Sequence, residues 1–225
     1  MNVSLGGTNT GTEVSTGLQL LLLFTVLSLA PSLLVMTTSF TRLVVVLSFL
    51  RTSLSIQQPS SQVIIALSLF LTGFIMFPIF SQIHREALVP LQEKKIELQT
   101  AIQRASAPLK QFMLKHTREK DLHLLLSMMP KDPANPPPVI KSPADLPIQA
   151  VIPAFMISEL RTAFQMGFVI FLPFLVIDMV VSSILMAMGM MMLPPMMVTM
   201  PMKILVFILA DGWNILIRSL VQSFQ

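Results

Sequence analysis

The sequence predicts an all-α, membrane-associated protein with four kinked or broken apolar helical segments, arranged as two hairpins around a polar helical insert. Hydrophobic residues make up 53% of the 225 residues and charged residues only 12%, whereas a soluble domain usually has about 25% charged residues. The mean hydropathy is +0.76. The charges are also unevenly spread, since residues 84–161 hold 11 of the 15 Lys and Arg and 8 of the 11 Asp and Glu.

The N-terminal part contains the first apolar helical pair, residues 18–83. Residues 1–17 are rich in Gly, Thr and Ser and are expected to form a flexible tail. Uncharged apolar stretches follow at 18–41 and 61–83, and each is close to the roughly 20 residues that a helix needs to cross a bilayer. The segment between them, 42–60, is expected to be a short loop.

A polar insert, residues 84–150, separates the two apolar halves. Apolar residues recur at helical spacing over 85–129, which predicts helices there. Residues 130–147 contain seven prolines and are expected to form an extended linker. The short connections 42–60 and 188–203 carry basic but no acidic residues, so the positive-inside rule places them in the cytoplasm and the insert on the periplasmic side.

The second apolar helical pair occupies residues 151–225. Its apolar stretches, 163–187 and 196–221, are interrupted by Asp178 and Asp211, which makes them weaker as lipid-facing spans. Prolines within or beside the apolar runs are expected to kink or break helices, and these are Pro31, Pro78, Pro173 and Pro201. Broken helices at membrane depth are tolerated only where neighbouring helices or a water-filled cavity satisfy the freed backbone groups.

A methionine cluster lies between the last two apolar stretches. Nine of the 18 methionines fall between Met186 and Met202. Gly189 loosens the helix and the Pro194-Pro195 pair prevents its continuation, so a loop is predicted between them. Because methionine is flexible and apolar, the cluster has two interpretations. It is either a hairpin tip packed with adaptable core residues or a hydrophobic constriction that gates a pore by dewetting.

Two carboxylates, Asp178 and Asp211, lie within apolar segments, where inserting a charge costs about 2.5–3.5 kcal/mol. Such charges usually have a partner, and the candidates are Arg42, Arg51, Lys203 and Arg218. The two aspartates are expected either to form structural ion pairs or to act directly in conduction. A pair of facing aspartates would also suit an intramembrane protease, although neither lies in a recognisable protease motif.

Catalysis and nucleic-acid binding lack a sequence signal. No phosphate-binding glycine loop, His-Glu-x-x-His zinc motif or Gly-x-Ser-x-Gly elbow is present, and the chain has no cysteine. We therefore predict no catalytic residue, no metal site and no cofactor. One Trp and no Tyr leave no basic-aromatic stripe for nucleic acid. Four helices are too few to enclose a channel for a polypeptide, so a conduit requires several copies or several partners.

Four segments of the chain resemble the P family of flagellar export-gate proteins. They are SFTRLVVVLSFLRTSL at 39–54, PAFMISELRTAFQMGF at 153–168, PFLVIDMVVSSILMAMGMMMLPP at 173–195 and DGWNILIRSLVQSF from Asp211. The resemblance implies a helical oligomer, an export gate of five copies with four Q-type subunits and one R-type subunit. It implies a place in the bacterial inner membrane at the flagellar basal body, beside other membrane proteins of the export apparatus. The expected cargo is unfolded secreted flagellar proteins.

The resemblance also implies roles for individual residues. A methionine gasket that closes the pore falls on Met190, Met191 and Met192, with Met186, Met188 and Gly189 in support. Charged residues expected to act structurally or between subunits are Arg42, Glu159, Arg161, Asp178, Lys203 and Asp211. In such a gate the apolar helices contact neighbouring subunits more than membrane lipid. The alternatives are an injectisome homologue that exports virulence effectors and a small-solute or ion transporter.

Overall fold

The computed structural model describes residues 21, 24–25, 27–29, 31–56, 59–129, 145–190 and 192–225. The chain divides into two compact units, Met1–Val35 and Met36–Gln225. The described residues of the first unit are helical. Its exposed large apolar side chains are Leu21, Phe24, Leu27, Leu29, Leu33 and Leu34. The predicted tail, residues 1–17, lies outside the described residues.

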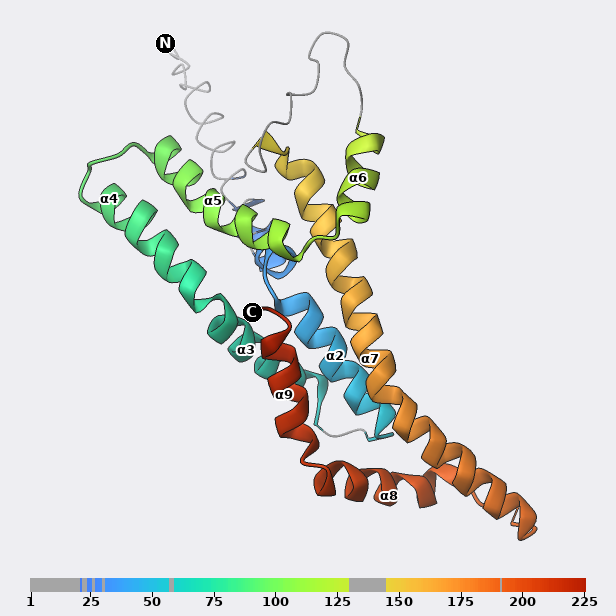
Figure 1. Cartoon of the computed structure of the whole chain (residues 1–225). Coiled ribbons are helices and arrows are strands. Elements are labelled where there is room, and N and C mark those ends of the chain that lie inside the picture. The colour runs from blue at the N-terminus through green and yellow to red at the C-terminus, as the bar shows by residue number, and fades with distance from the viewer. Residues whose placement is uncertain are drawn as a thin grey trace, which may run out of the picture. The chain divides into compact units, whose positions relative to one another are not determined.

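The second unit contains helices and turns but no strand among its described residues (Figure 1), which confirms the predicted all-α fold. In chain order the helices are α2 (Phe40–Ser53), α3 (Ser61–Ile83), the π-helix η1 (His84–Leu88), α4 (Val89–Gln92), α5 (Leu98–His116), α6 (Glu119–Met128), α7 (Ile148–Ala187), α8 (Pro195–Leu209) and α9 (Gly212–Gln222). Helix α2 packs along α7 and also contacts α3.

The expected loop at 42–60 is wrong, because α2 covers most of it. With 14 residues, α2 is too short to be recognised as a membrane span by its length. Its apolar side chains at Leu43, Val46 and Leu47 are nevertheless buried, and Arg42 beside them is only 3% exposed. A basic residue therefore does not mark a solvent-exposed loop here. The periplasmic placement of the insert depended partly on that loop, and it stays a prediction.

The polar insert is helical over η1, α4, α5 and α6, as predicted for 85–129. Pro90, two residues after η1, explains why the insert begins with a π-helix. A proline has no N–H and its ring crowds the carbonyl one turn earlier, so the turn widens and Val89 N–H donates to His84 O. Residues 130–144, which include most of the predicted proline-rich linker, lie outside the described residues.

The second apolar half begins with one helix of 40 residues, α7, which continues through Pro153 and Pro173. Pro78 and Pro201 likewise lie inside α3 and α8. None of these prolines ends its helix, because neighbouring turns and packed helices can satisfy the backbone group that a proline frees. A helix break occurs at Asp211, which adopts a left-handed φ of 51° between α8 and α9, and the kinks expected at the prolines stay a prediction.

Two hydrophobic clusters hold the second unit together. The larger cluster joins α2, α3, α7, α8 and α9, and its buried residues include Leu43, Leu50, Phe174, Phe207 and Leu220. The smaller cluster joins α3, α5, α7 and the residues after α9, and its buried residues include Met76, Phe112, Met113, Phe155 and Phe224. Because α3 and α7 each contribute to both clusters, these two helices together link the two apolar halves of the sequence.

Among the described residues, two helical stretches are long and apolar enough to cross a membrane, Ser61–Gln92 and Ile148–Ala187. The α8 and α9 helices pass the same test together, with a bend of 65° at the break between them. Up to four spans result if each of two bent helix pairs counts as one. The described part of the chain therefore contains the apolar helical segments that the composition predicted.

Candidate functional site

The methionine loop, defined as residues 188–194, joins α7 to α8. Helix α7 ends in a Schellman motif, in which Gly189 N–H donates to Met186 O and Met190 N–H donates to Leu185 O, both over 3.0 Å. Gly189 adopts a left-handed φ of 73°, which a glycine accepts without the steric cost of a Cβ. The loop predicted from the glycine and the two prolines is therefore present, and local backbone chemistry explains where α7 stops.

The methionine side chains of this loop are exposed in the single chain. Met188 is 65% exposed, Met190 40% and Met192 99%. Met186, in the last turn of α7, is 60% exposed. Met191 lies outside the described residues. The described side chains therefore do not form a packed core at the tip of the α7–α8 hairpin.

Helix α8 extends this exposed methionine surface. It begins with Pro194 at the N-cap and Pro195 at the first helical position, where the fixed φ of proline suits a helix start. Met196 and Met197, in its first turn, are both exposed. The loop and the start of α8 thus present several flexible apolar side chains close together in sequence, a composition that suits a hydrophobic seal.

Asp178 and Lys203 form an ion pair between α7 and α8. Lys203 Nζ donates to Asp178 Oδ2 over 2.6 Å and to Ser55 Oγ over 3.0 Å. The Lys203 side chain is 2% exposed and that of Asp178 39%. The buried ammonium therefore has both a carboxylate and a hydroxyl as acceptors, and a buried charge requires such partners.

Arg42 and Glu159 form a second ion pair, between α2 and α7, and this one is buried on both sides. Arg42 Nε donates to Glu159 Oε2 over 2.8 Å, and Nη2 donates to Oε1. Arg42 Nη1 donates to the backbone O of Ser223 over 3.0 Å and to its Oγ over 2.8 Å. The guanidinium carbon lies 3.8 Å from the ring centroid of Phe224. This bidentate pair joins α2, α7 and the residues after α9.

The remaining predicted charges, Arg161 and Asp211, have weaker contacts. Arg161 Nη1 lies 3.7 Å from Asp121 Oδ1, and the Arg161 side chain is half exposed, so the pair contributes little. No side-chain hydrogen bond or ion pair among the described residues joins Asp211 to Asp178. Lys203 Nζ binds the Asp178 carboxylate instead, and Asp211 lies at the break between α8 and α9.

Three polar residues of these networks were not predicted, Ser55, Asp121 and Ser158. Asp121 is buried and accepts a hydrogen bond from Ser158 Oγ over 2.7 Å, which ties α6 to α7. Ser158 adjoins Glu159 in a largely apolar segment, so its polarity was a usable signal. Ser55 and Asp121 gave no such signal, because only the fold brings them to partners 148 and 37 residues away.

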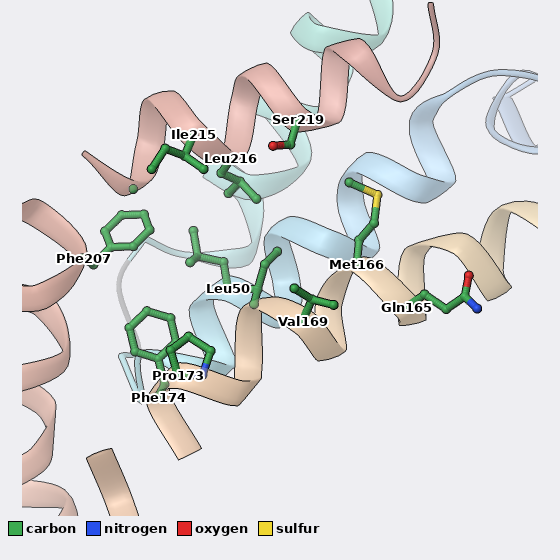
Figure 2. Close-up of a pocket in the computed structure, with 12 residues that line it drawn as sticks. Leu50, Gln165, Met166, Val169, Pro173, Phe174, Phe207, Ile215, Leu216 and Ser219 are labelled. Atoms are coloured by element: carbon green, nitrogen blue, oxygen red, sulfur yellow. The ribbon is translucent and has the colours of Figure 1, made fainter. Parts of the chain in front are cut away.

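An apolar cavity of about 450 Å³ lies between α2, α7, α8 and α9 (Figure 2). Leu50, Val169 and Leu216 line its middle, Phe207 lies at one end, and Gln165 lies at the other. No charged residue lines it, so the cavity suits an apolar side chain or an acyl chain. In the described part of the chain, no three metal-ligating side chains come together.

Comparison with known proteins decides the family. A family model described as the FliP family matches residues 23–220. The chain belongs to the FliP family. The predicted resemblance to flagellar export-gate proteins is thereby confirmed at the level of the family.

FliP proteins of several bacteria are similar to this chain over most of its length. The flagellar biosynthetic protein FliP of Bacillus subtilis (strain 168) is 55% identical over 213 residues, which cover 94% of each chain. The FliP of Aquifex aeolicus (strain VF5) is 49% identical over 211 residues, covering 92% of this chain and 86% of the relative. The FliP of Caulobacter vibrioides is 48% identical over 229 aligned residues, covering 100% and 82%.

The FliP-family match places the chain among flagellar biosynthesis proteins of the export apparatus, whose components work together. The methionine loop and the Arg42–Glu159 and Asp178–Lys203 ion pairs lie within the matched residues 23–220. A transport or structural role fits this family, and its apolar helices fit a membrane-embedded apparatus.

Proposed function

We propose that this FliP-family chain is a core subunit of the flagellar type III export gate and that it works as a non-enzymatic conduit. In this proposal five copies assemble with four Q-type subunits and one R-type subunit in the bacterial inner membrane, at the flagellar basal body. Unfolded flagellar proteins pass through the shared pore, with energy supplied by other components of the apparatus. Rings of side chains from Met190, Met191 and Met192 close the pore between substrates.

The observation that carries the proposal is the exposure of the methionine loop. Burying a methionine side chain contributes about 1.5–3 kcal/mol, so a side chain that is 99% exposed, such as Met192, gains from a neighbour that covers it. In a ring of several copies around one axis, the methionine side chains of each copy would be covered by those of its neighbours. Their flexibility would let them fill an irregular opening and then part around a polypeptide.

Exposed aromatic side chains elsewhere support assembly with partners. Phe70, Phe74 and Phe77 of α3 are 76%, 66% and 70% exposed, and their spacing places them on one face of the helix. Large exposed apolar surfaces mark contacts with other proteins or with a membrane. We propose that neighbouring subunits cover most of this surface and that membrane lipid covers the rest.

The competing functions have less support. An intramembrane protease needs a free aspartate pair, but Lys203 Nζ binds the Asp178 carboxylate. A transporter built from inverted repeats needs similar halves, whereas α7 has 40 residues and α3 has 23. An injectisome role is less favoured because the FliP relatives described above are named for flagellar biosynthesis.

Replacing Met190, Met191 and Met192 together with Ala tests the seal. The purified complex carrying this triple variant is reconstituted into vesicles, and leakage of ions or small solutes is measured without export substrate. We expect normal assembly and raised leakage, because each copy loses three long apolar side chains from the constriction.

The matched control replaces Met128 and Met179 with Ala, since these methionines lie outside the loop and are 72% and 63% exposed. We expect this control to leak no more than the wild type. A triple variant that assembles normally and leaks no more than the wild type would refute the seal.

A further inference from the structure

We propose that the Asp178–Lys203 ion pair is a clamp that fixes α8 against α7 and thereby holds the methionine loop in its closed position, with Ser55 as a third member. This proposal rests on the gating function proposed above. It concerns the positioning of the loop, because none of the three residues lies in the loop itself.

The pair bridges the two arms of a helical hairpin whose tip is the methionine loop. Asp178 lies nine residues before the end of α7 at Ala187, and Lys203 lies eight residues after the start of α8 at Pro195. At 1.5 Å per residue, both positions are about 12–14 Å from the loop along their helices. A bond at nearly equal depth on both arms restrains the spacing between them, and the position of the tip follows from that spacing.

Lys203 is the buried member of the clamp. Its side chain is 2% exposed, so the ammonium must keep a polar or anionic acceptor wherever α8 moves. Its hydrogen-bond acceptors among the described residues are Asp178 and Ser55. Helix α8 carries no other charged residue. A movement that separates α8 from α7 must therefore break this ion pair or supply Lys203 with a new acceptor.

Ser55 connects the clamp to the turn after α2. It adopts a left-handed φ of 58°, a conformation that is disfavoured for a residue with a Cβ. Its Oγ accepts the second hydrogen bond of Lys203 Nζ. Because Arg42 and Glu159 anchor α2 to α7, Ser55 and Asp178 are both fixed to the same packed part of the molecule. Lys203 therefore holds α8 against α7 and the turn after α2.

Asp178 is the less buried member of the clamp in the single chain. Its side chain is 39% exposed in the single chain, so water or a polar group of a neighbouring subunit can take over its hydrogen bonds when the pair separates. A pair with one partly exposed partner is easier to open than a pair that is buried on both sides. The Arg42–Glu159 pair, by contrast, is buried on both sides. In this proposal the Arg42–Glu159 pair stabilises the fold, and the Asp178–Lys203 pair opens to release the loop.

The test uses the complete complex reconstituted into vesicles, with the native mass as a check of assembly. Asp178→Asn removes the charge with little change in shape. We expect about a tenfold increase in ion leakage, equivalent to about 1.4 kcal/mol lost from the closed state. Asp178→Glu keeps the charge and should leak much less than Asp178→Asn. A merely structural role would lower the yield of complex without changing the leakage of the complex that does assemble.

Thr199→Val is the matched control. Thr199 lies one turn before Lys203 on α8, is fully buried, and has no hydrogen-bond partner for its Oγ1 among the described residues. Removing that hydroxyl keeps the shape of the side chain and breaks no bond of the clamp. We expect wild-type leakage from this variant.

An assembled Asp178→Asn complex with wild-type leakage overturns the clamp. The methionine triple variant separates the two proposals. If the triple variant leaks and Asp178→Asn does not, the seal is supported and the clamp is refuted. If neither variant leaks, the gating function itself is refuted. If Asp178→Asn does not assemble, Ser55→Ala takes its place, since it removes only one hydroxyl acceptor. Raised leakage from Ser55→Ala supports the clamp, and unchanged leakage overturns it.

Discussion

Arg42 and Glu159 stand 117 residues apart in the chain, yet Arg42 Nε donates to Glu159 Oε2 over 2.8 Å, with side chains that are 4% and 0% exposed. The same guanidinium donates to Ser223 and lies over the ring of Phe224. Three distant segments therefore meet at one buried cation. Each charge depends on the other, because an unpaired charge at this depth is strongly unfavourable.

Removing one member of this pair should destabilise the protein strongly. Glu159→Leu leaves the Arg42 guanidinium buried without its carboxylate, and we expect a loss of about 3–5 kcal/mol in the free energy of unfolding. The double variant Arg42→Met with Glu159→Leu should lose less than the sum of the two single variants, because neither charge is then left unpaired. Denaturant unfolding in detergent measures both. Additive losses from the two single variants would show that the pair is not coupled.

Two glycines offer a matched test of the turn after α7. Gly189 has a φ of 73°, and a Cβ added there would have no neighbouring atom within 4 Å, so Gly189→Ala adds backbone strain without a clash. We expect it to cost about 1–2 kcal/mol. Gly73 lies inside α3 with equally open surroundings, and Gly73→Ala should be neutral or stabilising by up to about 1 kcal/mol. Thermal unfolding compares them, and equal effects would contradict the assigned turn.

The free energy of unfolding of the protein should depend on pH through His116, at the end of α5. Burial, followed by the charges of Arg42 and Lys115, lowers the pKa of His116 from 6.5 to about 4. Between these values the unfolded chain binds a proton that the folded chain does not. This contribution to stability is therefore fully present above pH 6.5 and is lost as the pH falls towards 4, by at most about 1.4 kcal/mol per pH unit.

The measurement is the midpoint of thermal unfolding between pH 7 and pH 4.5. His116→Leu should flatten the slope, whereas His84→Leu, at an exposed position, should keep the wild-type slope. A slope that survives in His116→Leu would assign the pH dependence to other groups. The surroundings of the His116 ring are apolar, since Phe112 and Phe224 lie 4.8 and 5.2 Å from it between ring centroids, and a charged imidazole is disfavoured there.

Local signals predicted the helical content and the methionine loop. Gly189 and the two prolines that follow specify a helix end and a helix start within a few residues, so no distant contact is needed to find the loop. The exposure of Met192 could not be predicted, because the same side chains would suit a packed hairpin tip. The sequence pattern therefore located the candidate gate without deciding what covers it.

Distant contacts account for the errors. Arg42 was expected in a loop because it follows the uncharged apolar stretch 18–41, whereas its carboxylate partner lies on another helix. Ser55 was missed for the same reason, since its role depends on Lys203 at the other end of the sequence. Pairing of Asp178 with Lys203 was one of several options that the sequence left open, and only the packing of α8 against α7 selects it.

The central claim is that this FliP-family chain works as one subunit of a closed, multi-subunit gate. The most direct test is the native mass of the complex extracted from membranes together with its Q-type and R-type neighbours. The account predicts a single assembly that contains five copies of this 25.0 kDa chain, four Q-type subunits and one R-type subunit. A stable, export-competent monomer, or an assembly without several copies of this chain, would contradict it.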